Sequence, residues 1–435
     1  MENKKVFLNK VDETFEIFTH KSGLRVILAH KDLHTSYALL GVGFGSIYEK
    51  CVYGGEVLTY PDGTAHFLEH QMFANPDGED TFEKFSRLGA NANAYTSNER
   101  TCYLFSTGGH FEECLEVLLR GVFSPWFIKK NVDKEKKIII EELKMYRDDP
   151  RDAVDRALMR TIYGEHRLRR DICGTVSSVR SVTPEILYSA YERFYRPTNA
   201  VLSLCGRFDE KKIGEILDAC ITEKAEPMPH VELYDVEKEP EKCHKSKRTV
   251  YPDLSTPCVA IGVKGVPFFK GSKEHLRHFN AMSVIGQMLF SSAGPFISGA
   301  IDDKLIPDTP SFEVVHTENC SHILFESFAY DPKEVLRRFE ICRKKFLSDG
   351  ISEEDLTRAK KSLWADFLEN FNSSEGCAHL YLSDLSEGID TSDTAECIFS
   401  LTKEEVDRLA KSILQKERVC AVTALPRKQK KGVRI

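Results

Sequence analysis

The sequence lacks the features that mark several large classes of protein. It has no excess of basic residues, because 60 Lys and Arg face 67 Asp and Glu and the formal net charge is −7. Nucleic-acid-binding proteins usually carry a basic balance or a basic stripe, so the composition disfavours that class. No run approaches the roughly 20 consecutive apolar residues of a membrane-spanning helix. We therefore expect neither nucleic acid nor a membrane as a partner.

Paired cysteines are missing as well. The 13 cysteines are scattered from Cys51 to Cys420, with no C-x-x-C and no close clusters. A secreted disulfide scaffold or a structural zinc site would space them in pairs. The segment Met1–Lys10 contains no apolar run long enough for a signal peptide. We expect free thiols and a cytoplasmic protein.

The composition that remains is that of a globular protein with sizeable cores. Of the 435 residues, 41% are hydrophobic and 29% are charged. Residues 237–242 are charged, contain proline and lie in a stretch without periodicity, which indicates an exposed linker over 223–248. This linker divides the chain into a first domain, 1–222, and a second, 249–435.

The two parts of the chain echo each other. The amphipathic segment 111–119 and the helical segment 133–145 that follows it are similar to 332–339 and 353–367 in the second part. Both parts also contain strand-like apolar segments. We therefore predict an α+β fold of two similar domains, each a mostly antiparallel sheet packed with helices.

One short motif carries metal chemistry. His66, Glu69 and His70 form the pattern H-x-x-E-H. On a helix the two histidines are one turn apart and project from the same face, where they can bind one Zn²⁺. Glu69 reaches the same side without having to be a ligand, as in the inverted zinc-peptidase motif. The alternative is an amphipathic helix with one core and one exposed histidine.

A catalytic zinc ion usually has three protein ligands and one open position, so a third ligand must come from elsewhere. The best candidate is the helical segment that contains Glu135, Glu141 and Glu142. Glu135 and Glu142 are seven residues apart and share one face, so one could bind the metal while the other supports it. The alternative is a solvated acidic face.

These residues resemble the pitrilysin/insulinase family of inverted-motif zinc peptidases. The resemblance also rests on Gly63–Ala65, Gly89–Thr96, Asp148–Pro150, Tyr195–Ala200 and Ser291–Phe296. It covers nearly the whole chain, at the length of one two-domain subunit, and is closest to bacterial cytoplasmic members. It implies that the chain forms half of a clamshell of four such domains.

The resemblance implies one zinc ion per chain, with His66, His70 and Glu142 as its ligands. It assigns Glu69 as the general base and Glu135 as the supporting carboxylate. In the family the ligand glutamate lies seven residues after the supporting one, which selects Glu142 over Glu141.

The resemblance also implies a substrate-binding strand. Asn93, Ala94 and Tyr95 match the strand to which an extended peptide adds through main-chain hydrogen bonds. The expected activity is that of a zinc metalloendopeptidase that hydrolyses short or unfolded oligopeptides, maturing or degrading a specific peptide.

The second half of the chain departs from the family pattern. It has no second H-x-x-E-H, and Ala300–Pro307 contains neither the arginine nor the tyrosine that fully equipped members use to hold the substrate carbonyl. We therefore expect a heterodimer with a metal-free homologous subunit that supplies this Arg/Tyr pair, with a homodimer as the alternative arrangement.

Two other functions are compatible with the motifs. The first is a non-catalytic or scaffold subunit of a peptidase heterodimer that keeps a structural zinc. The intact Glu69 argues against it, because a structural site has no need of a carboxylate that does not bind the metal. The second is a zinc hydrolase of non-peptide substrates, which would leave the segment Gly89–Thr96 without a role.

Overall fold

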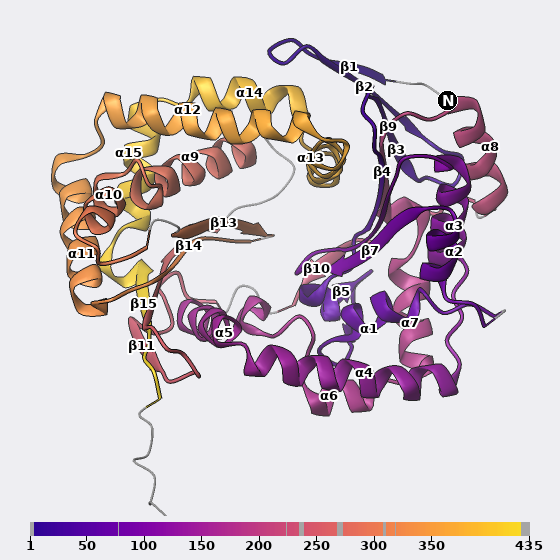
Figure 1. The fold of residues 1–435 in the computed structure, drawn as a ribbon, viewed down its shortest axis with the longest axis horizontal. Coiled ribbons are helices and arrows are strands. Elements are labelled where there is room, and N and C mark those ends of the chain that lie inside the picture. Colours follow the sequence, from indigo (N-terminus) through magenta and orange to yellow (C-terminus); the bar gives the residue numbers. More distant parts are fainter. Residues whose placement is uncertain are drawn as a thin grey trace, which may run out of the picture. The chain divides into compact units, whose positions relative to one another are not determined.

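The computed structural model describes residues 4–76, 78–222, 224–234, 239–267, 273–307, 310–317 and 319–427. It divides into two compact units (Figure 1). The first unit contains the residues up to Leu143 together with Arg170–Tyr234 and Asp366–Ala395. The second contains Lys144–Arg169, Asp235–Ala365 and the residues from Glu396 onward.

Each unit therefore includes a segment from the other half of the sequence. The predicted domains, 1–222 and 249–435, are continuous stretches of chain, whereas each compact unit is assembled from three stretches. Contact patterns between helices and sheets decide this division, and they cannot be read from hydrophobic periodicity.

A seven-stranded sheet forms the centre of the first unit, in the order β1-β2-β3-β9-β4-β8-β7. Its strands are β1 (Lys4–Leu8), β2 (Glu13–Thr19), β3 (Arg25–His30), β4 (Ser36–Val42), β7 (Ala90–Thr96), β8 (Thr101–Thr107) and β9 (Ala200–Gly206). Only the β3–β9 pair is parallel. Strand β7 ends the sheet, so one of its edges is not paired within this sheet.

Helices cover both faces of this sheet. They are α1 (Thr64–Gln71), α2 (Thr81–Arg87), α3 (Phe111–Phe123), α6 (Val176–Ser181), α7 (Pro184–Phe194), α8 (Glu210–Cys220) and α13 (Ser374–Glu387), with the 3₁₀ turns η1 (Ser46–Glu49), η3 (Pro197–Asn199) and η5 (Asn370–Asn372). Helices α1 and α2 contact β7, and α3 contacts β8. The apolar residues of α3 recur at helical spacing and are buried in the core on this face.

Helix α13 comes from the second half of the sequence and packs on β4 and β9 of the first sheet (Figure 1). Cys377, Tyr381 and Leu382 of α13 are buried in a second core together with strand residues such as Leu39 and Val201. The runs of apolar residues in β4 and β9 agree with burial on both faces.

The second unit repeats the plan of the first. Its sheet has the order β11-β15-β12-β14-β13, formed by β11 (Lys247–Val250), β12 (Cys258–Lys264), β13 (Ser311–Thr317), β14 (Cys320–Phe328) and β15 (Val419–Ala424). Its first pair, β11–β15, is parallel and the other pairs are antiparallel. The order β3-β9-β4-β8-β7 of the first sheet has the same pattern. The predicted fold of two similar, mostly antiparallel α+β units is confirmed.

The helices of the second unit are also divided between two faces. They are α5 (Pro150–Ile162), α9 (Lys273–Phe290), α10 (Pro295–Asp302), α11 (Pro332–Asp349) and α15 (Lys403–Ile413), with η2 (Arg167–Arg169) and η6 (Lys416–Arg418). Helices α12 (Glu353–Glu369) and α14 (Thr391–Ser400) belong to this unit except for the end of α12 and the start of α14, which fall in the segment of the first unit. Helix α5 packs on β11, β12 and β15. It follows the long helix α4 (Lys129–Asp148) as α13 follows α12, so the two units exchange equivalent helices.

One stretch of the described chain, Glu274–Asp302, is long and apolar enough to cross a membrane by length and composition alone. It comprises α9 and α10, which are separated by a short turn at Gly294. In its most apolar window 61% of the residues are buried within the structure. Such burial is typical of a core helix.

Part of the segment expected to be an exposed linker is packed into the second unit. The side chain of Glu239 is only 5% exposed, because it pairs with the buried Nζ of Lys264 and accepts hydrogen bonds from the backbone N–H groups of Glu165 (2.6 Å) and His166 (2.8 Å). A charged residue is buried at tolerable cost when its charge and hydrogen bonds are matched. Residues 223 and 235–238 of this segment lie outside the described residues. A small sheet, β10-β5-β6, includes another part of it, and its strands are β5 (Lys50–Tyr53), β6 (Glu56–Thr59) and β10 (Val231–Leu233).

Candidate metal centre

The helix that carries H-x-x-E-H is anchored at its N-terminus by two features. Gly63, directly before α1, has a φ of 93°, and a Cβ there would lie 2.5 Å from the carbonyl oxygen of Cys173. The buried carboxylate of Glu49 accepts hydrogen bonds from the N–H groups of Gly63 (2.9 Å) and Ala65 (3.0 Å). A negative charge is favourable at a helix N-terminus, where N–H groups lack partners within the helix.

The side chains of His66, His70 and Glu142 converge on one point. Oε2 of Glu142 lies 3.7 Å from Nε2 of His66 and 3.4 Å from Nε2 of His70. The donor atoms of the three residues all lie within 4.8 Å of one another, and the described residues contain no other such group of three or more. In a tetrahedral zinc site with bonds of about 2.0–2.2 Å, neighbouring ligand atoms are about 3.3–3.6 Å apart. The donor set therefore fits zinc.

Glu135 supports this set from one side. Its Oε1 lies 2.9 Å from Nδ1 of His70, on the ring edge opposite the nitrogen that faces Glu142. A carboxylate at this position selects the tautomer that presents Nε2 to a metal and raises the basicity of the ligand. Helix α4 supplies both carboxylates, and their spacing of seven residues places them on one face of the helix. Glu141, the alternative from the sequence, is exposed.

The two imidazoles have opposite pKa shifts. Burial lowers the pKa of His66 to about 4, and the neighbouring His70 acts in the same direction. Burial also disfavours the charged form of His70, but the hydrogen bond with Glu135 and the negative charge of the nearby Glu142 outweigh this and raise its pKa to about 9. Two carboxylates thus favour positive charge at this point. The same preference favours a divalent cation.

Glu69 lies beside this cluster on the same helix. Burial raises the pKa of its carboxyl group, and a hydrogen bond from Thr96 opposes that shift. The Oγ1 of Thr96 is 2.5 Å from Oε2 of Glu69. A partly buried carboxylate with a raised pKa is suited to accept and return a proton.

The three residues of the predicted substrate strand are placed differently. Asn93 and Ala94 line the pocket next to the metal centre, and Oδ1 of Asn93 accepts a hydrogen bond from the N–H group of Ala94 (2.9 Å). The ring of Tyr95 instead stacks on His379 of α13, with the ring centroids 6.0 Å apart. The side chain of Tyr95 therefore packs the strand against α13.

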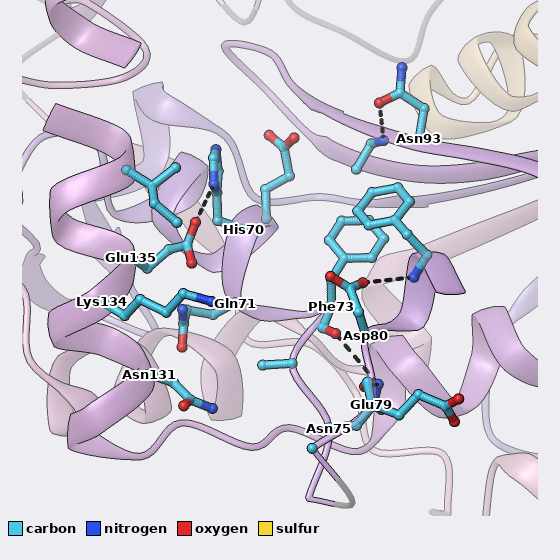
Figure 2. Close-up of a pocket in the computed structure, with 16 residues that line it drawn as sticks. His70, Gln71, Phe73, Asn75, Glu79, Asp80, Asn93, Asn131, Lys134 and Glu135 are labelled. Atoms are coloured by element: carbon cyan, nitrogen blue, oxygen red, sulfur yellow. Dashed lines mark hydrogen bonds and ion pairs between the residues drawn. The ribbon is translucent and has the colours of Figure 1, made fainter. Parts of the chain in front are cut away.

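A cavity of about 440 Å³ adjoins Glu69, His70 and Glu135 (Figure 2). Its wall comes from the segment after α1, from α2, from β7 and from α4. Besides the residues already described, it is lined mainly by Phe73, Asn75, Glu79, Asp80, Phe82, Asn131, Lys134 and Ile138. The rings of Phe73 and Phe82 are stacked at 4.2 Å. This cavity therefore has both apolar and charged side chains next to the His66, His70 and Glu142 cluster.

Comparison with known proteins decides the family. Residues 25–176 match the insulinase model of peptidase family M16, and residues 181–363 match the model of the M16 inactive domain. The chain is 30% identical over 430 residues to the "uncharacterized zinc protease YmfH" of Bacillus subtilis (strain 168), a match that covers 98% of this chain and 99% of the relative. The chain belongs to the insulinase family of peptidases, M16. The predicted resemblance is thereby confirmed.

Solved structures show the same fold for this insulinase-family chain. An M16-like protein from Alicyclobacillus acidocaldarius matches with a TM-score of 0.90 and 28% identity, over 95% of this chain and 98% of that one. A protease from Helicobacter pylori matches with a TM-score of 0.80 and 21% identity, over 95% and 100% of the two chains. The second likeness bears on the fold alone.

Sequence reasoning missed three residues of this insulinase-family centre. Glu49 caps the metal-binding helix, Thr96 contacts Glu69, and Gly174 packs against the turn before α1, where a Cβ would lie 2.1 Å from the carbonyl oxygen of Asp62. Gly63 begins one segment on which the family resemblance rests, and Thr96 ends another. The resemblance could therefore have pointed to both residues. No local pattern connects Glu49 to the helix that it caps.

The second unit has no comparable donor set among its described residues. Ser362 of α12 hydrogen-bonds through Oγ to Oε1 of Gln287 on α9 (3.1 Å). Helix α12 is the equivalent of α4 in this unit, and it has Lys361 and Ser362 near the position of the ligand glutamate. At this position it therefore makes a hydrogen bond between neutral side chains. This agrees with the match of residues 181–363 to the model of the M16 inactive domain.

Proposed function

We propose that this chain is a zinc metalloendopeptidase that cleaves short or unfolded oligopeptides. The observation that carries the proposal is the convergence of His66, His70 and Glu142 with the partly buried Glu69 beside them. A purely structural zinc site needs no carboxylate next to the ligands that is not itself a ligand. The zinc-protease names of relatives such as YmfH support the same activity.

The roles of the residues follow from their positions. When bound, zinc would polarise the scissile carbonyl and lower the pKa of a water molecule. Glu69 accepts the proton of that water and passes it to the leaving amine. Glu135 keeps the ring of His70 oriented through the hydrogen bond to Nδ1.

The peptide substrate is proposed to bind as an added strand. No other described strand pairs with the outer edge of β7 in its sheet, and the pocket lies at Asn93 and Ala94 of this strand. Main-chain hydrogen bonds to such an edge hold an extended segment, while the pocket receives a side chain. A folded protein cannot present an extended segment in this way, which favours short or unfolded peptides.

The decisive experiment is the variant Glu69→Gln, assayed with a library of quenched fluorescent peptides. We expect the variant to retain zinc and to lose turnover by about 100- to 10,000-fold, because proton transfer by Glu69 is lost. Glu83→Gln on the exposed face of α2 is the matched control and retains full turnover. Unchanged turnover in Glu69→Gln refutes the role of Glu69.

We further propose a heterodimer with a metal-free homologous subunit in the cytoplasm. The absence of arginine and tyrosine from Ala300–Pro307 supports a partner that supplies them. All 13 cysteines are free thiols in the structure, and ten of them are buried, which supports a reducing compartment. Activity that appears only after mixing the chain with its metal-free homologue supports the heterodimer. Absence of cleavage with and without that homologue favours the non-catalytic alternative.

A further inference from the structure

The hydroxyl group of Thr96 touches the proposed general base. Thr96 is the last residue of β7, and the alternation of side chains along this strand directs it to the face that carries α1. Its Oγ1 lies 2.5 Å from Oε2 of Glu69, a short distance typical of a hydroxyl that donates to a carboxylate. The contact joins the substrate strand to the metal-binding helix.

The surroundings of Thr96 determine the direction of this hydrogen bond. Its register partner Thr101 is fully buried and donates its own hydroxyl proton to the carbonyl oxygen of Phe44 (2.8 Å). The Oγ1 atoms of Thr96 and Thr101 are 3.5 Å apart, so Glu69 is the closer acceptor by 1 Å. The proton of Thr96 therefore points to Glu69.

The Thr96–Glu69 contact lies near a pair of buried tyrosines. The hydroxyl groups of Tyr103 and Tyr195 are 2.8 Å apart in the core behind β7 and β8. Burial raises the pKa of Tyr195, its hydrogen bonds with Tyr103 and Thr101 oppose this shift, and the negative charge of Glu69 adds to it. Tyr195 opens the segment Tyr195–Ala200, which carried part of the family resemblance without a role at the site.

We propose that Thr96 is a positioning residue, whose hydroxyl holds Oε2 of Glu69 so that the other carboxylate oxygen faces the reacting water. This inference rests on the proposed peptidase function. It gives the substrate strand a second task, because the strand that binds the peptide also orients the base. A displacement of the base by about 1 Å is enough to slow a positioned reaction strongly.

Two variants of Thr96 separate the hydroxyl from the shape of the side chain. Thr96→Val keeps the shape and removes the donor, whereas Thr96→Ser keeps the donor. Loss of a hydrogen bond to a charged group predicts a fall in kcat of about tenfold to a hundredfold in Thr96→Val, with KM unchanged. We expect Thr96→Ser to stay within about threefold of the wild-type kcat.

Thr107→Val is the matched control. Thr107 is buried on β8 of the same sheet, and its hydroxyl hydrogen-bonds to the carbonyl oxygen of Gly109. This variant loses a comparable buried hydrogen bond away from Glu69. We expect a lower unfolding temperature with kcat unchanged, whereas Thr96→Val lowers kcat with its zinc content unchanged.

A spectroscopic measurement tests the contact without catalysis. In metal-free protein labelled with ¹³C at glutamate Cδ, the resonance of Glu69 is identified by its absence in Glu69→Gln. At one fixed pH we expect this resonance to shift in Thr96→Val and to stay at the wild-type position in Thr96→Ser and Thr107→Val. An unshifted resonance in Thr96→Val overturns the proposal.

The kinetic outcomes are equally decisive. Unchanged kcat in Thr96→Val, or an equal fall in Thr96→Ser, also overturns the proposal. If the wild type cleaves no peptide with or without its homologue, the proposed function fails, and the Glu69 resonance still decides whether Thr96 holds this carboxylate. The two failures are therefore distinguishable.

Discussion

Neighbouring carboxylates on α4 have different surroundings and hence different roles. Oε2 of Glu142 lies 3.4 Å from His70 and 3.7 Å from His66, a spacing that suits a shared metal ion better than direct hydrogen bonds. The next residue toward the N-terminus, Glu141, is exposed to solvent. One step along a helix rotates a side chain by about 100°, so only one of the two can reach the histidines.

This difference predicts the effect of two single substitutions on zinc binding. Glu142→Gln removes a negatively charged ligand, and we expect the zinc affinity to fall by roughly 100-fold or more, beyond the 10- to 100-fold loss common for supporting residues. Glu141→Gln has the same change in charge and is expected to keep wild-type affinity. Competition with a chelating dye measures both. Equal losses in the two variants contradict the assigned ligand.

Buried histidines in the second unit make its stability depend on pH. Nδ1 of His322 shares a hydrogen bond with the hydroxyl of Tyr163 (2.7 Å), and the ring is fully enclosed. Burial lowers the pKa of His322 to about 3, and the charges of His166 and Lys264 act in the same direction. Lys264 is itself paired with Glu239 in this interior. In the folded protein His322 is therefore neutral over a wider pH range than in the unfolded chain.

The lowered pKa of His322 determines how the stability changes with pH. Above the ordinary histidine pKa of about 6.5 neither state of His322 is charged. Below it the unfolded chain binds a proton that the folded chain rejects, so the free energy of unfolding falls by about 1.4 kcal/mol per pH unit until about pH 3. We expect the destabilisation caused by His322→Gln at pH 7 to shrink by about 2 kcal/mol at pH 5. Denaturant unfolding at both pH values measures this, and a pH-independent difference contradicts it.

At the scale of elements, the position of α1 depends on its first turn more than on its length. The helix has only eight residues, which is too short for stability on its own. The carboxylate of Glu49 in η1 accepts hydrogen bonds from the N–H groups of Gly63 and Ala65, and Gly63 lets the chain before α1 pass close to Cys173. These contacts set where His66 and His70 lie relative to α4.

Two glycines with similar φ values allow the effect of the close approach between Gly63 and Cys173 to be separated from backbone strain. Gly63 and Gly55 have φ values of 93° and 91°, but a Cβ at Gly55 would meet no atom of the described residues within 4 Å, whereas one at Gly63 would clash with Cys173. We expect Gly55→Ala to cost about 1–2 kcal/mol of unfolding free energy, because its φ is in the left-handed region, and Gly63→Ala to cost more than Gly55→Ala, with weaker zinc binding. Urea unfolding and chelator competition check this. Equal costs would show that the close approach is unimportant.

At the scale of the whole molecule, the two halves of the sequence exchange one helix. Helix α13 covers β4 and β9 of the first unit, and α5 covers β11, β12 and β15 of the second. Without α13, the strand residues that it covers, among them Leu39 and Val201, would face water. Exposed apolar faces of this kind promote aggregation.

The exchange predicts the behaviour of fragments. We expect residues 1–222 expressed alone to lack cooperative thermal unfolding and to aggregate, because α13 is absent. Coexpression of 1–222 with 223–435 should restore a soluble complex that binds zinc, since the second fragment carries α13. Size-exclusion chromatography and calorimetry measure this. A cooperatively folded, soluble 1–222 fragment would contradict the importance of the exchanged helix.

The sequence alone determined the features that depend on neighbours along the chain. The H-x-x-E-H spacing indicated two histidines on one helical face, and the seven-residue spacing within α4 indicated a shared face for Glu135 and Glu142. Helical periodicity located α3, and the echo between the halves indicated two similar units. Each of these follows from the repeat of a single helix or strand, which acts over a few residues.

Only the tertiary structure decided which distant segments meet. It brought Glu49 to the start of α1 and Thr96 to Glu69, buried Glu239 in the supposed linker and moved α13 to the first unit. These contacts join residues that are far apart in sequence and are selected by packing and charge matching across the whole chain. No local pattern encodes them, because their partners come together only when the sheets and helices assemble.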